Sequence, residues 1–427
     1  MKSDRNAPFA GRARYVCAIA ASLSPLVAWS DWESIPDIRL EVEANDNPRL
    51  GQSPDERGID AEELEDHTAT RMLFDGRVQL RNAGQRGEVT LQPRIRLDTY
   101  SDEIDDDLER QDFYLNVRSA YRWPRSTAGF RANLARESIL SAELVDTGVL
   151  DPTDPVDDPG DNETGLLTLL DEFRNRANIS PYAELSLSER SALLVEARYI
   201  DVSYTGPDLR NRTDFSDLSL SVGVGRTIDD RTGASASLIA SRYEADANGN
   251  ETDTVGVEGS FNRELSEIWS FSLTTGLQRS DFAFVDENGE RVDNAATNYT
   301  LDLSFSKRTE IASLDIGLFR LLNPNAVGFL TERNELRVLY RRQLRERLRA
   351  GIGFRAVETG ALDGDSIDRE YFRADFDLEW SFTPAWALSV RYGAVDQRFS
   401  GDRLDGNANL FSIGAVYRGL ARPRQQP

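Results

Sequence analysis

The chain has 427 residues, of which 39% are hydrophobic and 29% are charged, and acidic residues outnumber basic ones by 73 to 50. The resulting net charge of −23 argues against nucleic acid as a partner, because phosphate backbones are bound through basic surface. One histidine and one cysteine exclude a disulfide or a cysteine-rich zinc site within the chain, and we expect no metal and no cofactor.

The first thirty residues have the pattern of an export signal. A positively charged start that includes Lys2 precedes an apolar stretch, residues 15–27, and residues 28–30 place small side chains around a cleavage site. No later apolar run is long enough for a membrane helix. We therefore predict a signal peptide at residues 1–30, followed by one exported domain at residues 31–427.

Apolar and polar residues alternate through much of the exported chain. Between Phe372 and Phe382 every even position is apolar, whereas the odd positions from Arg373 to Glu379 are charged. A helix would scatter these apolar side chains around its circumference, but a strand places all of them on one face. The same pattern recurs in three further segments, at residues 269–277, 299–306 and 410–417.

Short and long connections follow each other along the chain. Tight polar turns are predicted at residues 187–190, 228–231, 265–268, 307–310, 344–347 and 382–385. Longer polar connections, such as residues 246–251, 286–295 and 360–367, lie between them. This order is typical of a bacterial outer-membrane barrel, which has short periplasmic turns and long outer loops.

The pattern predicts an all-β protein, an antiparallel up-and-down transmembrane barrel of about eighteen strands in the bacterial outer membrane. An even number of strands returns both ends of the barrel to the periplasm. Pro93 and Pro181 fall inside two of these strands and each removes one ladder donor. The expected strand centres are Leu40, Arg77, Arg94, Val117, Ala132, Pro181, Ala197, Val222, Leu238, Val257, Leu273, Leu303, Ile316, Val338, Ile352, Phe376, Val390 and Ile413.

A soluble β-sandwich or a secreted β-solenoid would also alternate. Neither needs aromatic residues at the strand ends, and such residues do gather near the short turns here, as in the aromatic girdle of a membrane barrel. They are Trp123, Trp269, Trp380, Trp386, Tyr392 and Tyr417. We therefore favour the barrel.

Three features resemble one family: residues 41–50 (EVEANDNPRL), residues 141–148 (SAELVDTG) and the repeated Leu-Ser-Glu turns. The sequence is similar to the β-barrel porin family of exopolysaccharide-locus (EpsL-like) and exosortase-associated outer-membrane proteins. The resemblance implies an outer-membrane channel for exported polysaccharide. Expected partners are outer-membrane lipid and lipopolysaccharide, a polysaccharide substrate and the barrel-assembly machinery. Because residues 418–427 follow the aromatic Tyr417, the assembly signal would be internal.

The inner face should carry any transport chemistry, and it is rich in arginine. We predict a pore-lining, substrate-binding set on the fourteenth to seventeenth strands: Arg337, Arg341, Arg349, Arg355, Arg373 and Arg391. The planar guanidinium suits carboxylates, sulfates and sugar hydroxyls. The alternative is that inward arginines only form ion pairs with Asp75, Asp98, Asp375, Asp377 and Glu379. Strands eight to eleven should instead face inward with Ser219, Ser221, Gly223, Ser235, Ser237, Ser270 and Ser272.

Two outer connections are strongly acidic, at residues 102–109 and 151–163. Oxygen-rich clusters can bind calcium, but no EF-hand spacing is present, so solvated loops are favoured. The connection at residues 138–172 also has an apolar piece, residues 166–170, which could fold inward as a plug or pack on the rim.

An enzyme is not expected. His67 stands in a polar segment and no Gly-x-Ser-x-Gly elbow occurs, which argues against an outer-membrane hydrolase. Asp375 and Asp377 could mimic the carboxylate pair of a glycosidase, since alternate residues of a strand are about 7 Å apart. Nearby arginines explain these acids without catalysis. The remaining alternative to a channel is a structural or adhesive surface barrel.

Overall fold

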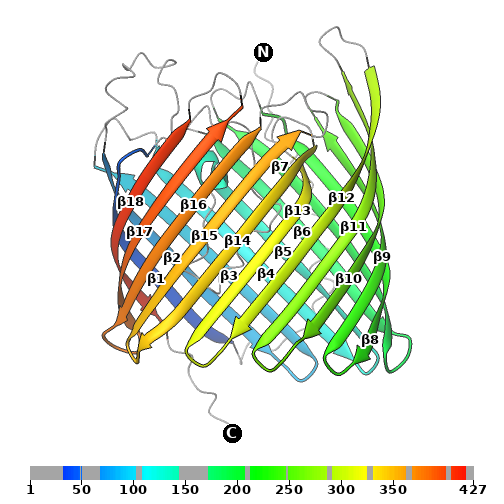
Figure 1. Cartoon of the computed structure of the whole chain (residues 1–427), viewed down its shortest axis with the longest axis horizontal. Coiled ribbons are helices and arrows are strands. Elements are labelled where there is room, and N and C mark those ends of the chain that lie inside the picture. Colours follow the sequence, from blue (N-terminus) through cyan, green and yellow to red (C-terminus); the bar gives the residue numbers. More distant parts are fainter. Residues whose placement is uncertain are drawn as a thin grey trace.

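The computed structural model describes residues 32–48, 50, 68–101, 108–143, 172–206, 212–246, 249–285, 291–324, 330–361, 368–400 and 405–419. These residues form one antiparallel sheet of eighteen strands in which each strand pairs with its neighbours along the chain. The sheet closes because the last strand pairs with the first, with Asp37 opposite Arg418 and Asn45 opposite Leu410 (Figure 1). Closure removes the free edges that an open sheet would expose to lipid.

The strands of the first half are β1 (Glu33–Asn45), β2 (Ala69–Ala83), β3 (Gly87–Tyr100), β4 (Arg110–Trp123), β5 (Ser126–Ser138), β6 (Phe173–Ser186), β7 (Ser191–Thr205), β8 (Phe215–Asp229) and β9 (Thr232–Ala245). Those of the second half are β10 (Glu251–Glu264), β11 (Trp269–Val285), β12 (Arg291–Arg308), β13 (Ala312–Pro324), β14 (Leu330–Arg345), β15 (Leu348–Ala361), β16 (Arg369–Ser381), β17 (Trp386–Phe399) and β18 (Gly406–Arg418). A short helix, α3 (Ile139–Glu143), follows β5.

The predicted barrel and its strand count are confirmed, and every expected strand centre lies within a strand. The two prolines have the local effect that their missing N–H groups predict. The ladder between β2 and β3 is interrupted beside Pro93, and the ladder between β6 and β7 is interrupted beside Pro181. In both strands the pairing resumes in the same register on the far side of the gap.

Short turns join the strands at one end of the barrel, and the longer connections lie at the other end (Figure 1). The turn at residues 187–190, for example, is closed by backbone hydrogen bonds from Leu187 and Ser188 to the carbonyl of Ser191. The start of β1 and the end of β18 lie at the short-turn end, since Asp37 is opposite Arg418. This is the layout of an outer-membrane barrel with periplasmic turns.

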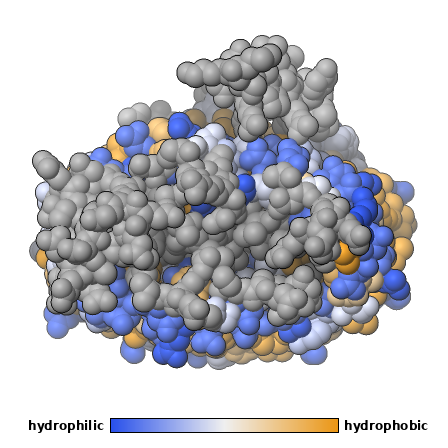
Figure 2. Space-filling view, turned by 90° about the horizontal axis from the view of Figure 1, so that it is seen from above, coloured by the Kyte–Doolittle hydropathy of each residue, from blue (hydrophilic) through white to orange (hydrophobic). Residues whose placement is uncertain are grey.

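The outer face is apolar where the alternation predicts it. On β8, Leu218, Leu220 and Val224 are about half exposed, and the intervening Ser219 and Ser221 face the lumen. Seen from the long-loop end, hydrophobic residues appear around the perimeter, interspersed with hydrophilic ones (Figure 2). A closed antiparallel barrel with an apolar outer face is the architecture of proteins in the bacterial outer membrane, in agreement with the predicted location.

Aromatic side chains lie on the outer face near the short turns, where a girdle is expected. Trp123, Trp380 and Trp386 are each about half exposed. Trp386 packs against Tyr417 with ring centroids 5.0 Å apart. Within the described residues no helix has the length and apolarity needed to cross a membrane.

Several predicted features lie outside the described residues. They are the signal peptide, His67, residues 102–107 of the first acidic segment, the acidic segment at residues 151–163, the apolar piece at residues 166–170 and the last eight residues of the tail. The predictions for these segments remain predictions.

Candidate functional site

The inner faces of β14 to β18 and β1 to β4 carry interlocked arginines and carboxylates, and we call this surface the charged wall. Glu335 is buried on this wall and contacts three guanidinium groups. Arg333 Nη2 lies 2.6 Å and Arg355 Nε 2.8 Å from the carboxylate oxygens, and Arg337 Nη2 lies 2.8 Å from Oε1. Arg333 and Arg337 stand two residues from Glu335, so the pleat of β14 places all three on one face.

A second ion-pair cluster crosses the seam where β18 meets β1. Arg391 Nη2 on β17 reaches over β18 to Glu41 and Glu43 on β1, at 2.7 and 3.1 Å. Small Ser412 stands opposite both Arg391 and Glu43 in the ladders and leaves room for this contact. Glu43 in turn pairs with Arg71 on β2 at 2.7 Å. The seam is therefore bridged by side chains as well as by the backbone ladder.

A third cluster lies nearer the short turns. Glu379 on β16 accepts hydrogen bonds from Arg349 on β15 at 2.9 Å and from Arg418 on β18 at 2.6 Å. Arg373 pairs with Asp375, two residues away on the same strand, at 2.9 Å. Oδ1 of Asp377 is buried without a hydrogen-bond partner in the described part of the chain.

The structure places all six predicted arginines on the inner face of four adjacent strands. Arg337, Arg355 and Arg373 share one row across β14, β15 and β16. Arg341 and Arg391 share a second row, separated by Gly351 and Asp377. The remaining one, Arg349, lies opposite Glu379.

These arginines differ in how much of their side chains is exposed. The side chain of Arg355 is fully enclosed and that of Arg391 is only 7% exposed, whereas that of Arg349 is 27% exposed. Arg337 is intermediate at 14%. Two of these arginines pair with acids that the sequence suggested, Arg349 with Glu379 and Arg373 with Asp375. Arg337, Arg355 and Arg391 pair with other acids, Glu335 and Glu41. Arg349 and Arg337 are the members best placed to meet a molecule in the lumen while keeping their carboxylate partners.

Sequence reasoning missed the main acid partners, which are Glu335, Glu41 and Glu43. Each could have been found from spacing alone. Glu335 alternates in phase with Arg333 and Arg337, so all three had to share one strand face. Glu41 and Glu43 alternate in the same way on β1.

The inner faces of β8 to β12 carry mainly small polar side chains, and we call this surface the serine-rich wall. The sequence-predicted Ser219, Ser221, Gly223, Ser235, Ser237, Ser270 and Ser272 all lie here, because they alternate with outward-facing apolar residues. A polar cavity of about 520 Å³ opens at its short-turn end, lined by residues that include Asn262, Ser272, Ser304 and Ser306. Hydroxyl groups of this kind both donate and accept hydrogen bonds.

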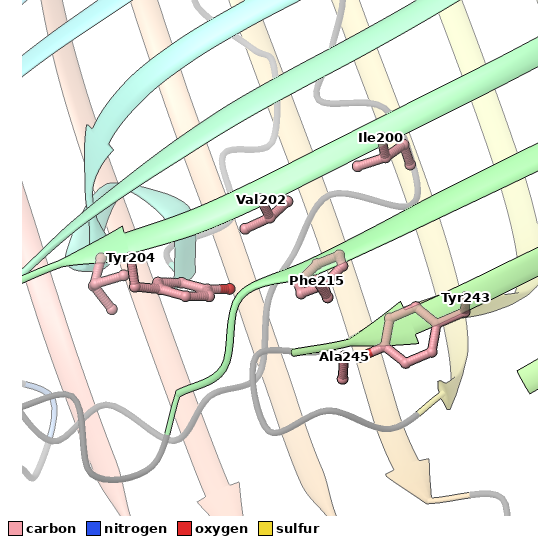
Figure 3. Close-up of a cluster of buried hydrophobic side chains, with 7 residues drawn as sticks. Ile200, Val202, Tyr204, Phe215, Tyr243 and Ala245 are labelled. Atoms are coloured by element: carbon pink, nitrogen blue, oxygen red, sulfur yellow. The ribbon is translucent and has the colours of Figure 1, made fainter. Parts of the chain in front are cut away.

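Near the long connections, the inner face of β7 to β9 becomes apolar. Ile200, Val202, Tyr204, Phe215, Tyr243 and Ala245 form a buried cluster together with Ile139 of α3 (Figure 3). Phe215 and Tyr243 pack with ring centroids 5.5 Å apart. Leu330, from the start of β14, also packs against the cluster. We call this the mouth cluster.

The mouth cluster was not predicted, although the sequence carries its signal. Towards the long connections the alternation changes sides: on β7 the inward Ile200 and Val202 are apolar, while the outward Asp201 is charged. On β9 the outward Arg242 and Glu244 flank the inward Tyr243. Charges on the outer face mark the level at which these strands leave the hydrocarbon region.

The connection after β5 is anchored inside the barrel at both ends. Ser141 Oγ of α3 donates to Asp112, 2.5 Å away, and the backbone N–H of Ser138 donates to the same carboxylate at 2.8 Å. At the far end, Glu172 is fully buried and pairs with Arg212. The first turn of this connection therefore packs on the inner wall.

The inward Asp375 and Asp377 do not form a free carboxylate pair, since Asp375 is held by Arg373. No group of three or more potential metal ligands occurs among the residues that the structure describes.

The comparisons with known proteins find solved structures that align with most of this chain at low identity. OccK2 (OpdF) of Pseudomonas aeruginosa, solved with glucuronate, matches 91% of this chain and 99% of its own at 11% identity and a TM-score of 0.44. OccAB3 of Acinetobacter baumannii matches 91% and 100% at 12% identity and a TM-score of 0.42. At these values the likeness assigns neither a family nor a substrate. No protein-family model and no curated protein matches the sequence.

Proposed function

We propose that this protein is an outer-membrane channel for a hydroxyl-rich or anionic polymer, such as an exported polysaccharide. The observation that carries the proposal is the division of the lumen into two unlike walls. The charged wall offers a few partly exposed guanidinium groups, at Arg349 and Arg337. The serine-rich wall offers small hydroxyl groups around a polar cavity of about 520 Å³.

The chemistry of both walls suits a sugar polymer in transit. Serine and asparagine side chains can exchange hydrogen bonds to water for hydrogen bonds to sugar hydroxyls with little net change in free energy. A guanidinium that already pairs with a carboxylate, as Arg349 does with Glu379, can add a further hydrogen bond without holding an anion tightly. Many weak contacts allow a chain to slide, whereas a cluster of unpaired arginines would trap it.

The partners expected from the sequence belong to the same proposal. We infer that the barrel is inserted by the assembly machinery, is surrounded by phospholipid and lipopolysaccharide, and serves polysaccharide export as its resemblance to EpsL-like barrels implies. The apolar outer face supports the lipid contacts.

The test uses the double variant Arg337→Ala/Arg349→Ala in cells that export polysaccharide. Glu335 then keeps Arg333 and Arg355, and Glu379 keeps Arg418, so folding should be preserved. We expect less surface polysaccharide and lower anion preference in planar bilayers, with unchanged heat-modifiable migration on gels. Arg242→Ala/Arg279→Ala removes the same charge from exposed positions near the long connections and should leave export intact.

Unchanged export and unchanged ion selectivity in the first variant would show that these arginines only balance Glu335 and Glu379. If the purified wild type also carried no current, a structural or adhesive barrel would replace the channel.

A further inference from the structure

A groove of about 330 Å³ lies on the outer wall near the short turns of β2 to β7. Tyr121, Ala128, Ala183 and Val195 form one row across β4 to β7, because each is opposite the next in the ladders. This row faces outward. Ala128 lies on the same face of β5 as Leu134, and Ala183 lies on the same face of β6 as Leu185; both leucines are exposed to the outside. The groove is therefore a feature of the lipid-facing surface.

Small side chains form the floor of the groove and aromatic rings form its side. Ala128 and Ala183 leave the floor open, and Phe130 extends from the neighbouring row. Tyr121 and Trp123 stand together at the short-turn end with ring centroids 4.6 Å apart. The shape and chemistry suit a single hydrocarbon chain.

One polar group faces this apolar groove without a partner. Asn82 lines it, is only 4% exposed, and its Nδ2 has no hydrogen-bond partner in the described part of the chain. It lies in one row with Val89 and Ser119, on the same face of β2 as the exposed Met72. A buried amide in apolar surroundings is costly unless something accepts its hydrogen bond. An ester carbonyl of a lipid would do so.

The turns beside the groove are basic. Arg86 lies in the turn between β2 and β3 and Arg125 in the turn between β4 and β5, both exposed, and neither side chain forms an ion pair with a described residue. The N–H of Arg122 donates to the carbonyl of Arg86 at 2.7 Å, so the two turns adjoin. Glu88, which lines the groove, is already paired with Arg81 at 2.8 Å.

We propose that this groove binds one anionic glycerophospholipid of the periplasmic leaflet. An acyl chain occupies the floor over Ala128 and Ala183, an ester oxygen accepts from Asn82, and the phosphate lies at Arg86 and Arg125. The leaflet follows from the position of the groove at the short-turn end, which faces the periplasm in such barrels. The charge follows from two arginines that form no ion pair with a described residue, since guanidinium groups recognise phosphate.

The experiment is native mass spectrometry of the purified barrel with an equimolar mixture of phosphatidylglycerol and phosphatidylethanolamine. We expect one retained phosphatidylglycerol per barrel. Ala128→Phe fills the groove and should weaken retention about tenfold, because the acyl contact is lost. Arg86→Gln/Arg125→Gln removes the positive charge and should also weaken retention about tenfold, the effect of losing a charged hydrogen bond. Asn82→Leu tests the ester contact.

Two controls match these changes elsewhere on the barrel. Ala374→Phe adds the same bulk to the outer face of β16, and Arg231→Gln/Arg347→Gln removes the same charge from two other short turns. Both should retain the lipid, and heat-modifiable migration shows that every variant is folded. Equal retention of the two lipids, or full retention in Ala128→Phe, overturns the proposal. A dimer that is lost in Ala128→Phe also overturns it, because the occupant is then a second copy of the chain.

Discussion

The charged wall and the serine-rich wall are built from the same alternation but are stabilised in different ways. On the charged wall ion pairs join the strands, as Arg355 does with Glu335 on the next strand and Arg391 with Glu43 across β18. On the serine-rich wall the contacts are short hydroxyl pairs between adjacent strands, such as Ser260 with Thr274 at 2.9 Å. On the charged wall, ion pairs hold the side chains in place. On the serine-rich wall, the hydroxyl groups can exchange their hydrogen bonds with molecules in the lumen.

The contrast teaches that inward arginines are not by themselves a substrate track. The enclosed arginines are structural, because carboxylate partners hold them from two residues away, from the next strand or, for Arg391, from across β18. Removing one partner leaves an uncompensated charge, which costs more than the pair itself contributes. Functional effects should therefore come from the few exposed arginines and from the opposite wall.

The largest expected effect is that of Glu335→Gln. Three guanidinium groups then lose their shared carboxylate, and we expect a loss of about 3 to 5 kcal/mol in the free energy of unfolding. Urea unfolding in lipid vesicles measures it. Glu258→Gln on the serine-rich wall is the matched change and should stay within about 0.5 kcal/mol. Similar losses in both would mean that the two walls do not differ in the way described.

Next in size is Leu273→Arg, on the outer face of β11. A charge near the middle of the hydrocarbon costs about 2 to 4 kcal/mol, whereas Ser272→Arg, its neighbour on the inner face, should hardly affect folding. The same unfolding assay decides the matter. Equal damage at both positions would indicate that both faces are buried, as in a sandwich.

A smaller effect is expected at the mouth cluster. Val202→Ala removes two buried methyl groups from the inner face and should destabilise the barrel by about 1.5 kcal/mol. Ser203→Ala, on the outer face of the same strand, should change stability by less than about 0.5 kcal/mol. If Ser203→Ala proved the more harmful change, the inversion of the alternation near the long connections would be wrong.

The barrel itself could be predicted from the sequence because period-two alternation and turn spacing are local signals. The strand centres from Leu40 to Ile413 needed no long-range information. The pairing of Arg391 with Glu41 did need it, since these residues are adjacent only after β18 closes against β1. Closure of the barrel also determines which arginines remain exposed to the lumen, because this depends on neighbouring strands and is not evident from the sequence of one strand.

The mouth cluster and the outer groove escaped prediction for a related reason. Ile139 joins the mouth cluster only because α3 turns inward, and a local pattern does not carry that direction. Asn82 stands next to the last residue of β2. Its burial depends on β3 and β4 lying beside it, through Val89 and Ser119.

Single-channel recording in planar bilayers tests the central claim most directly. The wild type should give a stable ionic current. Ser272→Arg/Ser304→Arg, which places two charges over the polar cavity, should lower the conductance and shift the reversal potential towards anions while the barrel stays folded. The absence of current from folded wild type, or an unchanged current in this variant, would contradict a channel that runs along the serine-rich wall.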